Sequence, residues 1–299
     1  MPLGIASFEH LLPALLKDPP PACAFELSEA GIEFATVGSS PQFKFGPLEP
    51  GVISLSPVHD NIQQPELLQA KIQSVAPSNG QKKRRAALIL PDYCARVTVL
   101  DFDAFPASHD EQLALVRFRM KKSVPFDVDS AIVSYHAQPS VEGKIEVVVA
   151  VMAWEIIARY EAPFRQLGIH PGFITTSALA ALNLVKPDKV TVVVKLSGRT
   201  LTILVLDGSV VKLARCVEME AALFEEIEST LHPTFAYIED ELQTKASRLV
   251  ECGFGAEERD YASRWQDEWE VAVEPLKSRF GMPGENNAGL LGYLESVRG

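Results

Sequence analysis

The sequence contains no apolar run that approaches the roughly 18 residues required by a membrane-spanning helix. A secretory signal has a basic segment ahead of an apolar stretch, and the N-terminus of this sequence lacks that pattern. The four cysteines (Cys23, Cys94, Cys216 and Cys252) are far apart, and no two form a CxxC pair. Cysteines placed in this way are usually small core residues of a protein in a reducing compartment, and not disulfide partners or zinc ligands. We therefore expect a cytoplasmic protein with no membrane span of its own.

Familiar catalytic motifs are also missing. The sequence has no P-loop, no GxGxxG and no GxSxG, and its histidines show neither metal-ligand spacing nor a neighbouring nucleophile. A net charge of −11 argues against a nucleic acid or an anionic membrane surface as the main partner. What remains is an ordinary globular composition, 47% hydrophobic and 22% charged. The chain of 299 residues is long enough for two domains with their own cores.

The strongest local signal is a group of three apolar runs between residues 191 and 216. A polar turn at 196–200 separates the first two runs, and Asp207-Gly208 separates the second from the third. Asp-Gly between apolar runs is a strong hairpin signal, because these residues supply the positive φ values that a two-residue turn requires. The sequence therefore predicts three adjoining antiparallel strands, at 191–194, 201–206 and 210–213.

The same unit occurs near the start of the chain. Apolar runs at 22–27 and 32–37 flank a turn at 28–31, and a third run follows at 42–45. The unit thus recurs after roughly 170 residues, which predicts two domains built on one plan.

An N-terminal arm precedes the first unit. Residues 8–17 carry apolar side chains at helical spacing, interrupted by Pro13, and three prolines at 19–21 then form a stiff spacer. Two interpretations stay open: a short helix packed on the surface of its own domain, or a detachable segment that occupies a groove on this or another chain.

Two helical segments follow the second unit. One is predicted at 219–231, and His232-Pro233 should break it before it resumes. In the other, an aromatic residue stands at every fourth position (Tyr261, Trp265 and Trp269), a stripe typical of a packed core. The remaining predicted elements are strands at 85–90, 95–100, 131–137, 144–151, 173–176 and 247–252 and helices at 64–75, 110–122, 154–167, 177–185 and 288–297.

Three segments carry a resemblance to the actin-like ATPase superfamily, closest to the PilM family of type IV pilus assembly proteins and more distantly to FtsA. Residues 88–135 are similar to the family's run of strand, helix, Pro-Phe and strand, although Ser134 stands where the family has Asp. Residues 146–174 match its strand, helix, Leu-Gly-Ile-x-Pro turn and strand, and residues 192–213 match its hairpin. The resemblance covers the chain from about residue 22 to the C-terminus.

The resemblance implies an α/β, actin-like (ribonuclease H-like) fold with duplicated domains and a small inserted α+β subdomain. On this basis we expect the following boundaries: an arm at 1–21, a first domain at 22–185 with the subdomain inserted at about 92–168, and a second domain at 186–299.

In the family, two hairpin turns and a glycine pair hold a nucleotide between the domains. Small residues let backbone N–H groups approach phosphates, and acidic residues organise the magnesium ion. The resemblance assigns these positions here to Glu26, Ser28, Ser197, Gly198, Thr200, Gly253 and Gly255.

Several of these positions depart from the family pattern. Ser28 and Ser197 stand where it has glycine, Lys195 stands where it has Asp, and Glu29 would repel a polyphosphate. Phe254 replaces a glycine and would crowd a base. We therefore expect a degenerate and empty nucleotide site, no cofactor and no enzymatic activity. The alternative is a working ATPase that binds ATP and Mg²⁺.

The function implied by the resemblance is that of a non-catalytic scaffold at the inner-membrane platform of the pilus. It would bind a short cytoplasmic peptide of a PilN-like membrane protein, in a groove walled by the helix at 110–122 and the loop at 123–126. The expected contacts are Arg117, Arg119, Lys121, Pro125 and Phe126. Three alternatives stay open: Phe126 as ordinary core, the cytoplasmic domain of a type II secretion platform protein, and a homo-oligomer.

Overall fold

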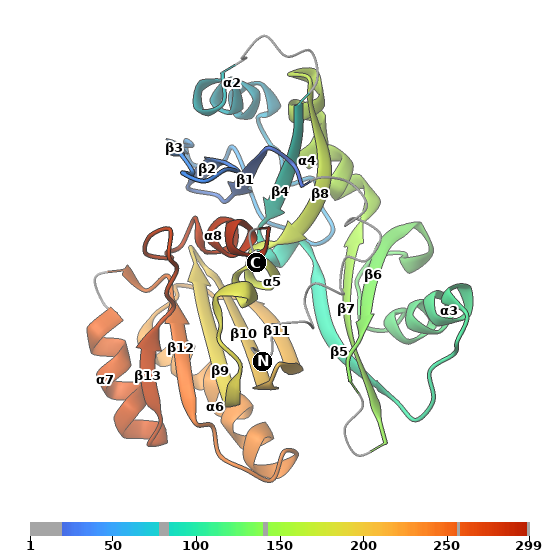
Figure 1. Cartoon of the computed structure of the whole chain (residues 1–299), viewed down its shortest axis with the longest axis vertical. Coiled ribbons are helices and arrows are strands. Elements are labelled where there is room, and N and C mark those ends of the chain that lie inside the picture. The colour runs from blue at the N-terminus through green and yellow to red at the C-terminus, as the bar shows by residue number, and fades with distance from the viewer. Residues whose placement is uncertain (1–19, 78–83, 140–142, 256–257, 298–299) are drawn as a thin grey trace.

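A computed structural model describes residues 20–77, 84–139, 143–255 and 258–297, so the predicted helix at 8–17 lies outside the described residues (Figure 1). Two five-stranded sheets follow one plan. In each, a central strand pairs antiparallel with the next strand of its hairpin and parallel with a later strand. The first sheet has the order β3 (Phe43–Pro47), β2 (Gly31–Thr36), β1 (Cys23–Leu27), β4 (Arg84–Leu90), β8 (Ile169–Thr176). The second has the order β11 (Val210–Glu218), β10 (Thr200–Gly208), β9 (Asp188–Ser197), β12 (Arg248–Cys252), β13 (Ala272–Pro275).

The duplicated unit predicted from the sequence is therefore confirmed. The predicted Asp207-Gly208 turn is shifted by one residue, because Asp207 pairs with Val210 and the turn is formed by Gly208 and Ser209. Gly208 adopts a positive φ of 60° at the end of β10, and β11 starts two residues later. The strands of the second unit are longer than predicted, because β9, β10 and β11 extend beyond their apolar centres. β13 follows no pattern that the sequence analysis recognised.

A three-stranded sheet lies between β4 and β8 in the chain and packs against β11 of the second sheet (Figure 1). Its order is β5 (Arg96–Phe102), β7 (Ile145–Ala153), β6 (Ala131–Ala137), and α3 (His109–Met120) packs on one face. The next helix, α4 (Trp154–Gln166), lies instead in the core of the first sheet through Ile156, Tyr160 and Phe164.

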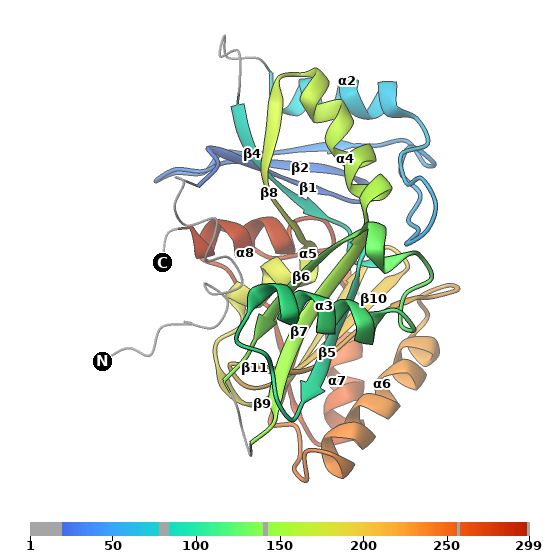
Figure 2. The same cartoon turned by 90° about the vertical axis from the view of Figure 1, so that its right-hand side faces the viewer.

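Helices cover both faces of the first sheet (Figure 2). Together with α4, α2 (Pro65–Val75) covers one face, and α8 (Ala288–Ser296) packs on β1 and β2 from the other. Thus α8, the last helix of the chain, packs on the sheet formed by the first strands. Near the centre of Figure 1 it also packs against the short helix α5 (Ser177–Ala181), where the two domains meet. Strand β4 continues into a 3-10 turn, η1 (Asp92–Cys94), close to the same place.

The outer face of the second sheet carries α6 (Phe224–Asp240) and α7 (Glu258–Trp269). Trp265 is fully buried and Tyr261 nearly so, which confirms the aromatic stripe as core. The predicted start and break of α6 are wrong. The helix begins five residues later than predicted and continues through Pro233, because its buried face, with Leu231, Thr234 and Ile238, runs through both halves. None of the described helices is long and apolar enough to cross a membrane.

Candidate functional site

The first hairpin turn, between β1 and β2, is closed by its own side chain. Ser28 Oγ accepts a hydrogen bond from the Gly31 N–H at 3.2 Å and donates one to the Gly31 carbonyl at 3.2 Å. The backbone N–H of Ser28 donates to the same carbonyl at 2.9 Å. Because Ser28 is buried and bonded within its turn, it contributes to the conformation of the turn and presents no free hydroxyl to a ligand.

The second turn, between β9 and β10, lies against the first. Gly198 has φ of 55°, and Glu29 Oε2 lies 3.7 Å from the position that a Cβ atom on Gly198 would occupy. Ser197 Oγ donates to the Glu285 carbonyl at 2.9 Å, while Thr200 is buried in the sheet. The structure thus brings together the two turns that the sequence analysis assigned to one site, with a carboxylate between them.

Next to these turns, Lys195 of β9 forms a buried ion pair with Asp92 of η1. Lys195 Nζ lies 3.1 Å from Asp92 Oδ2, and the two residues are 3% and 6% exposed. The same carboxylate accepts hydrogen bonds from Thr202 Oγ1 at 3.1 Å and from the Ala178 N–H at 2.7 Å. Asp92 therefore joins β9 and β10 of the second domain to α5, and each of its oxygens has a partner.

Glu26 of β1 occupies the corresponding position in the first domain and is 2% exposed. Ser177 Oγ donates to its Oε1 at 2.5 Å, and the Leu290 N–H donates to its Oε2 at 2.6 Å. The Gly289 N–H also approaches Oε1, at 3.4 Å. The carboxylate thus satisfies free N–H groups in the first turn of α8, where the helix dipole favours negative charge.

The pKa values reflect this arrangement. Burial alone would lower the pKa of Lys195, but the Asp92 and Glu26 carboxylates outweigh it, so the pKa is raised and the ammonium group stays charged. Burial also raises the pKa of Glu26, against the opposing effects of Lys195 and the hydrogen bonds from Ser177 and Leu290. Lys195 is therefore an internal cation held between two acidic side chains.

The glycine pair at the end of β12 has a structural role. Gly253 has φ of 90°, and a Cβ atom there would lie 2.0 Å from the Leu196 carbonyl oxygen, so no larger residue fits. Gly255 has φ of 59° and open space around it. The expectation that Phe254 crowds a ligand is wrong, because its ring packs 5.1 Å from Trp265 in the core under α6 and α7.

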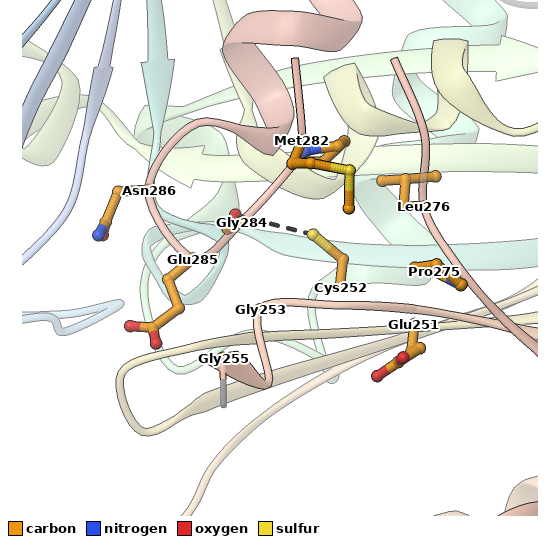
Figure 3. Close-up of a pocket in the computed structure, with 11 residues that line it drawn as sticks. Glu251, Cys252, Gly253, Gly255, Pro275, Leu276, Met282, Gly284, Glu285 and Asn286 are labelled. Atoms are coloured by element: carbon orange, nitrogen blue, oxygen red, sulfur yellow. Dashed lines mark hydrogen bonds between the residues drawn. The ribbon is translucent and has the colours of Figure 1, made fainter. Parts of the chain in front are cut away.

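A pocket of about 340 Å³ opens beside this glycine pair (Figure 3). The ends of β12 and β13 form one side, and the loop before α8 forms the other, where Cys252 Sγ lies 3.7 Å from the Gly284 carbonyl oxygen. The lining includes two acidic residues, Glu251 and Glu285, and the largely exposed Met282. Among the described residues, no group of three or more His, Cys, Asp or Glu side chains is placed to hold a metal ion.

Comparisons with family models and with curated proteins find no match to this sequence. Solved structures do match, over most of the chain. A PilM-PilN type IV pilus biogenesis complex gives a TM-score of 0.73 at 18% identity, covering 94% of this chain and 99% of the other. A protein with actin-like ATPase fold from Bacteroides thetaiotaomicron gives 0.56 at 12% identity, covering 94% and 98%. The cytoplasmic domain of EpsL, an inner-membrane component of the type II secretion system of Vibrio cholerae, gives 0.52 at 10% identity, covering 93% and 94%.

This chain has the actin-like fold. Within it, the residues that the sequence analysis assigned to a nucleotide form two groups. Glu26 and Ser28 bond to their own domain or to α8, whereas Gly253 and Gly255 line the pocket. Ser197 connects the groups through its bond to the loop before α8.

The basic residues predicted to contact a partner are bonded within the subdomain. Arg117 donates to the carbonyls of Val128 and Ala131, the second bond being 3.1 Å long. Arg119 lies over the Phe102 ring, 5.0 Å from its centroid. Lys121 forms an exposed ion pair with Asp129 at 3.0 Å. All three cations therefore have partners within the subdomain, and the exposed Lys121 pair adds little stability.

Phe126 lies between the core of the first sheet and the core of the subdomain, partly buried and packed against both, while Pro125 is exposed. Two apolar side chains near this junction were missed by the sequence analysis. Ile132 is the second residue of the edge strand β6 and is 43% exposed, and Trp154 starts α4 and is 51% exposed. Ile132 pairs with Met152, two residues before Trp154, so both residues stand at the same end of β6 and β7.

No sequence pattern pointed to Asp92, Thr202, Ser177 or the N-terminus of α8. One signal was available, because Lys195 stands among valines in a run that had to be buried. A buried ammonium group requires a carboxylate partner. The sequence did not reveal which acidic residue supplies it.

Proposed function

We propose that this protein is a non-catalytic scaffold of the type IV pilus assembly platform, cytoplasmic and held at the inner membrane by a PilN-like partner. The structural likeness to a PilM-PilN complex supports the choice of system. The internal cation Lys195 supports the non-catalytic role most directly. Lys195 is paired with the carboxylate of Asp92, and Thr202 donates to the same carboxylate. A hydrated magnesium ion would need such carboxylate oxygens as ligands, but these oxygens already have partners.

The hairpin turns add a second electrostatic argument. Glu29 Oε2 lies beside Gly198, between the turns that would have to enclose phosphate groups. Two like charges about 4 Å apart near a protein surface repel by about 4 kcal/mol. A polyphosphate would therefore have to displace the Glu29 side chain, and the internal ion pair would compete with its magnesium ion. The proposed site is degenerate, and the two domains are held together without nucleotide.

A titration with MgATP tests this part of the proposal. Thermal unfolding and calorimetry should detect no binding at millimolar nucleotide. A working site would be easy to see, because ligand at 100 times its dissociation constant stabilises a protein by about 2.7 kcal/mol. Magnesium-free ATP serves as the control for weak anion binding. A micromolar dissociation constant that depends on magnesium would contradict the proposal and favour an ATPase.

The partner peptide is proposed to lie along β6, at the junction between the subdomain and the first sheet. Among the described strands β6 is an edge of its sheet, so its outer backbone groups can pair with an extended peptide. Ile132 and Trp154 offer an exposed apolar contact there, and Phe126 lies at the same junction. The cations of α3 would attract an acidic segment of the peptide.

A fluorescence anisotropy titration with a dye-labelled synthetic cytoplasmic peptide of the PilN-like partner tests this site, because its signal does not depend on any tryptophan of the protein. Trp154 is the most exposed of the three tryptophans, so its emission should also change on binding. Trp154→Ala should weaken binding at least about tenfold, as expected for an aromatic anchor. Leu67→Ala is the matched control, because Leu67 is 47% exposed on α2, away from this junction. Equal losses in both variants, or none in Trp154→Ala, would move the site elsewhere.

A type II secretion platform is the second candidate, favoured by the likeness to the cytoplasmic domain of EpsL. Both candidates describe an actin-like scaffold bound to an inner-membrane protein, so the partner distinguishes them. Affinity capture from the native organism, followed by mass spectrometry, should recover pilus platform proteins. Recovery of secretion platform proteins in their place would select the second candidate.

A further inference from the structure

The first sheet has one strand that α8 leaves uncovered. In β3, Phe43 pairs with Ala35 of β2, and Phe45 pairs with Glu33. Directly paired residues of antiparallel strands point to the same face of the sheet. Ala35 packs in one cluster with residues of α8, so Phe43 and Phe45 face the same side as that helix.

These two phenylalanines form an apolar strip beside α8. Phe43 is 39% exposed and Phe45 is 43% exposed. The opposite face of β3 is covered, since Lys44 bonds to the Ser74 carbonyl of α2 and Gly46 lies against Val75. A sheet in an α/β fold normally buries both of its faces under helices. One further helix, placed next to α8, would complete this layer.

The start of the chain lies within reach of the strip. The Val37 N–H donates to the Ala22 carbonyl at 2.9 Å, and the Thr36 N–H donates to the Gln42 carbonyl at 3.2 Å. Ala22 is therefore level with the start of β3, about two strand spacings or roughly 10 Å away. Residues 17–21 can span roughly 15 Å when proline-rich and extended.

The arm also has the composition of a covering helix. Its apolar residues stand at spacings of three and four, on one face of a helix: Phe8, Leu11, Leu12, Leu15 and Leu16. We propose that residues 8–16 pack as a helix, kinked at Pro13, on Phe43 and Phe45, beside α8, and so complete the cover of the first sheet within the same chain.

Two features favour the chain's own arm over a second copy of β3. The strand is only five residues long and contains Lys44 and Pro47, which oppose pairing between sheet edges. The arm is tethered close to the strip, and a short tether gives an effective concentration in the millimolar range.

Photo-crosslinking in the full-length protein tests the position of the arm. A benzoylphenylalanine introduced at Leu12 should crosslink to residues 43–47 within the monomer. The same probe at His10, on the other side of the helical pattern, should give at least about tenfold less of this product if one face docks. Crosslinks in a dimer band would show that a second copy is the occupant, and crosslinks to any other surface would also overturn the proposal.

Hydrogen exchange in a set of matched variants provides an independent test. Leu12→Ser/Leu16→Ser should speed the exchange of the amides that β3 donates to β2 about tenfold, equivalent to 1.4 kcal/mol. The arm substitutions should have no further effect in a Phe43→Ser/Phe45→Ser background. In a Leu67→Ser background, where another exposed apolar residue is changed, their full effect should remain. Equal effects in all backgrounds would overturn the proposal.

Discussion

The two hairpin units are built on one plan but have different surroundings. In the second unit, β9 has ten residues, and its third strand, β11, bonds to the subdomain through Gln138 and the Val211 backbone at 2.8 and 2.7 Å. In the first unit, β1 has five residues, and its third strand leaves Phe43 and Phe45 exposed. The same topology can therefore end in an internal contact or in an open edge, depending on a few side chains.

The same contrast appears at matched positions in the two first strands. Glu26 and Lys195 each stand two residues before the serine of their turn. The acid in the first domain accepts N–H groups of α8, and the base in the second domain pairs with Asp92 of η1. At this matched position the two units have the same backbone topology but side chains of opposite charge. Each side chain bonds to a segment that is distant in the sequence.

Of the changes considered, removal of the Lys195 ammonium group should lower the stability of the protein most. Lys195→Ala leaves Asp92 buried without its cation and should lower the free energy of unfolding by about 3–5 kcal/mol. Urea unfolding measures the loss. Lys245→Ala, which breaks the exposed pair with Glu270, should cost less than about 0.5 kcal/mol. Lys195→Met/Asp92→Leu should recover part of the stability, since both charges of the pair are then removed together and only Glu26 stays buried. A single variant as stable as the wild type would refute this account of the ion pair.

The second largest effect is expected where the two units differ at the ends of β4 and β12. Pro91-Asp92 follows β4, whereas β12 is followed by Gly253, whose backbone conformation and proximity to the Leu196 carbonyl exclude a side chain. Gly253→Ala should cost about 3 kcal/mol or more, because steric overlap adds to a strained φ. Gly255→Ala has a similar φ but open space, and should cost about 1 kcal/mol. Equal losses in urea unfolding would show that φ alone matters.

Removing the acid should have a smaller effect than removing the base. Glu26→Ala leaves N–H groups of α8 without an acceptor, which should cost about 2 kcal/mol. Hydrogen exchange should also become faster in the first turn of α8. Glu29→Ala, a change at an exposed carboxylate in the same turn, should alter stability by less than about 0.5 kcal/mol. A loss as large as that of Lys195→Ala would contradict the proposed ranking.

The smallest effect is a pH dependence in the first unit. Burial, with a further contribution from Glu26, raises the pKa of Glu33 to about 7, above its unfolded value. The folded state therefore favours the protonated form, and stability present below pH 4.5 is lost as the pH rises through 7. Glu33→Gln should exceed the wild type at pH 8 by roughly 1 kcal/mol, after discounting for solvent screening. Unfolding at pH 4.5 should show almost no difference.

Local patterns were sufficient for much of the fold. The hairpin between β10 and β11, the aromatic stripe of α7 and the repeat of the hairpin unit all follow from residues close together in the chain. The boundaries of α6 did not follow from such local patterns. Glu226 accepts the N–H groups of residues 220–222, and Ala222 adopts a φ of 53°, so the helix starts only after this turn.

The sequence by itself determined where most strands and helices form, with β13 and the bounds of α6 as exceptions, because their signals repeat every two or every three to four residues. It also determined that Lys195, placed among valines, needed a buried acid. Only the tertiary structure decided that Asp92, 103 residues away, is that acid, and that Glu26 accepts the Leu290 N–H across 264 residues. The physical reason is that a buried charge is stabilised by whichever partner the fold brings within hydrogen-bond distance, and no local pattern encodes that distance.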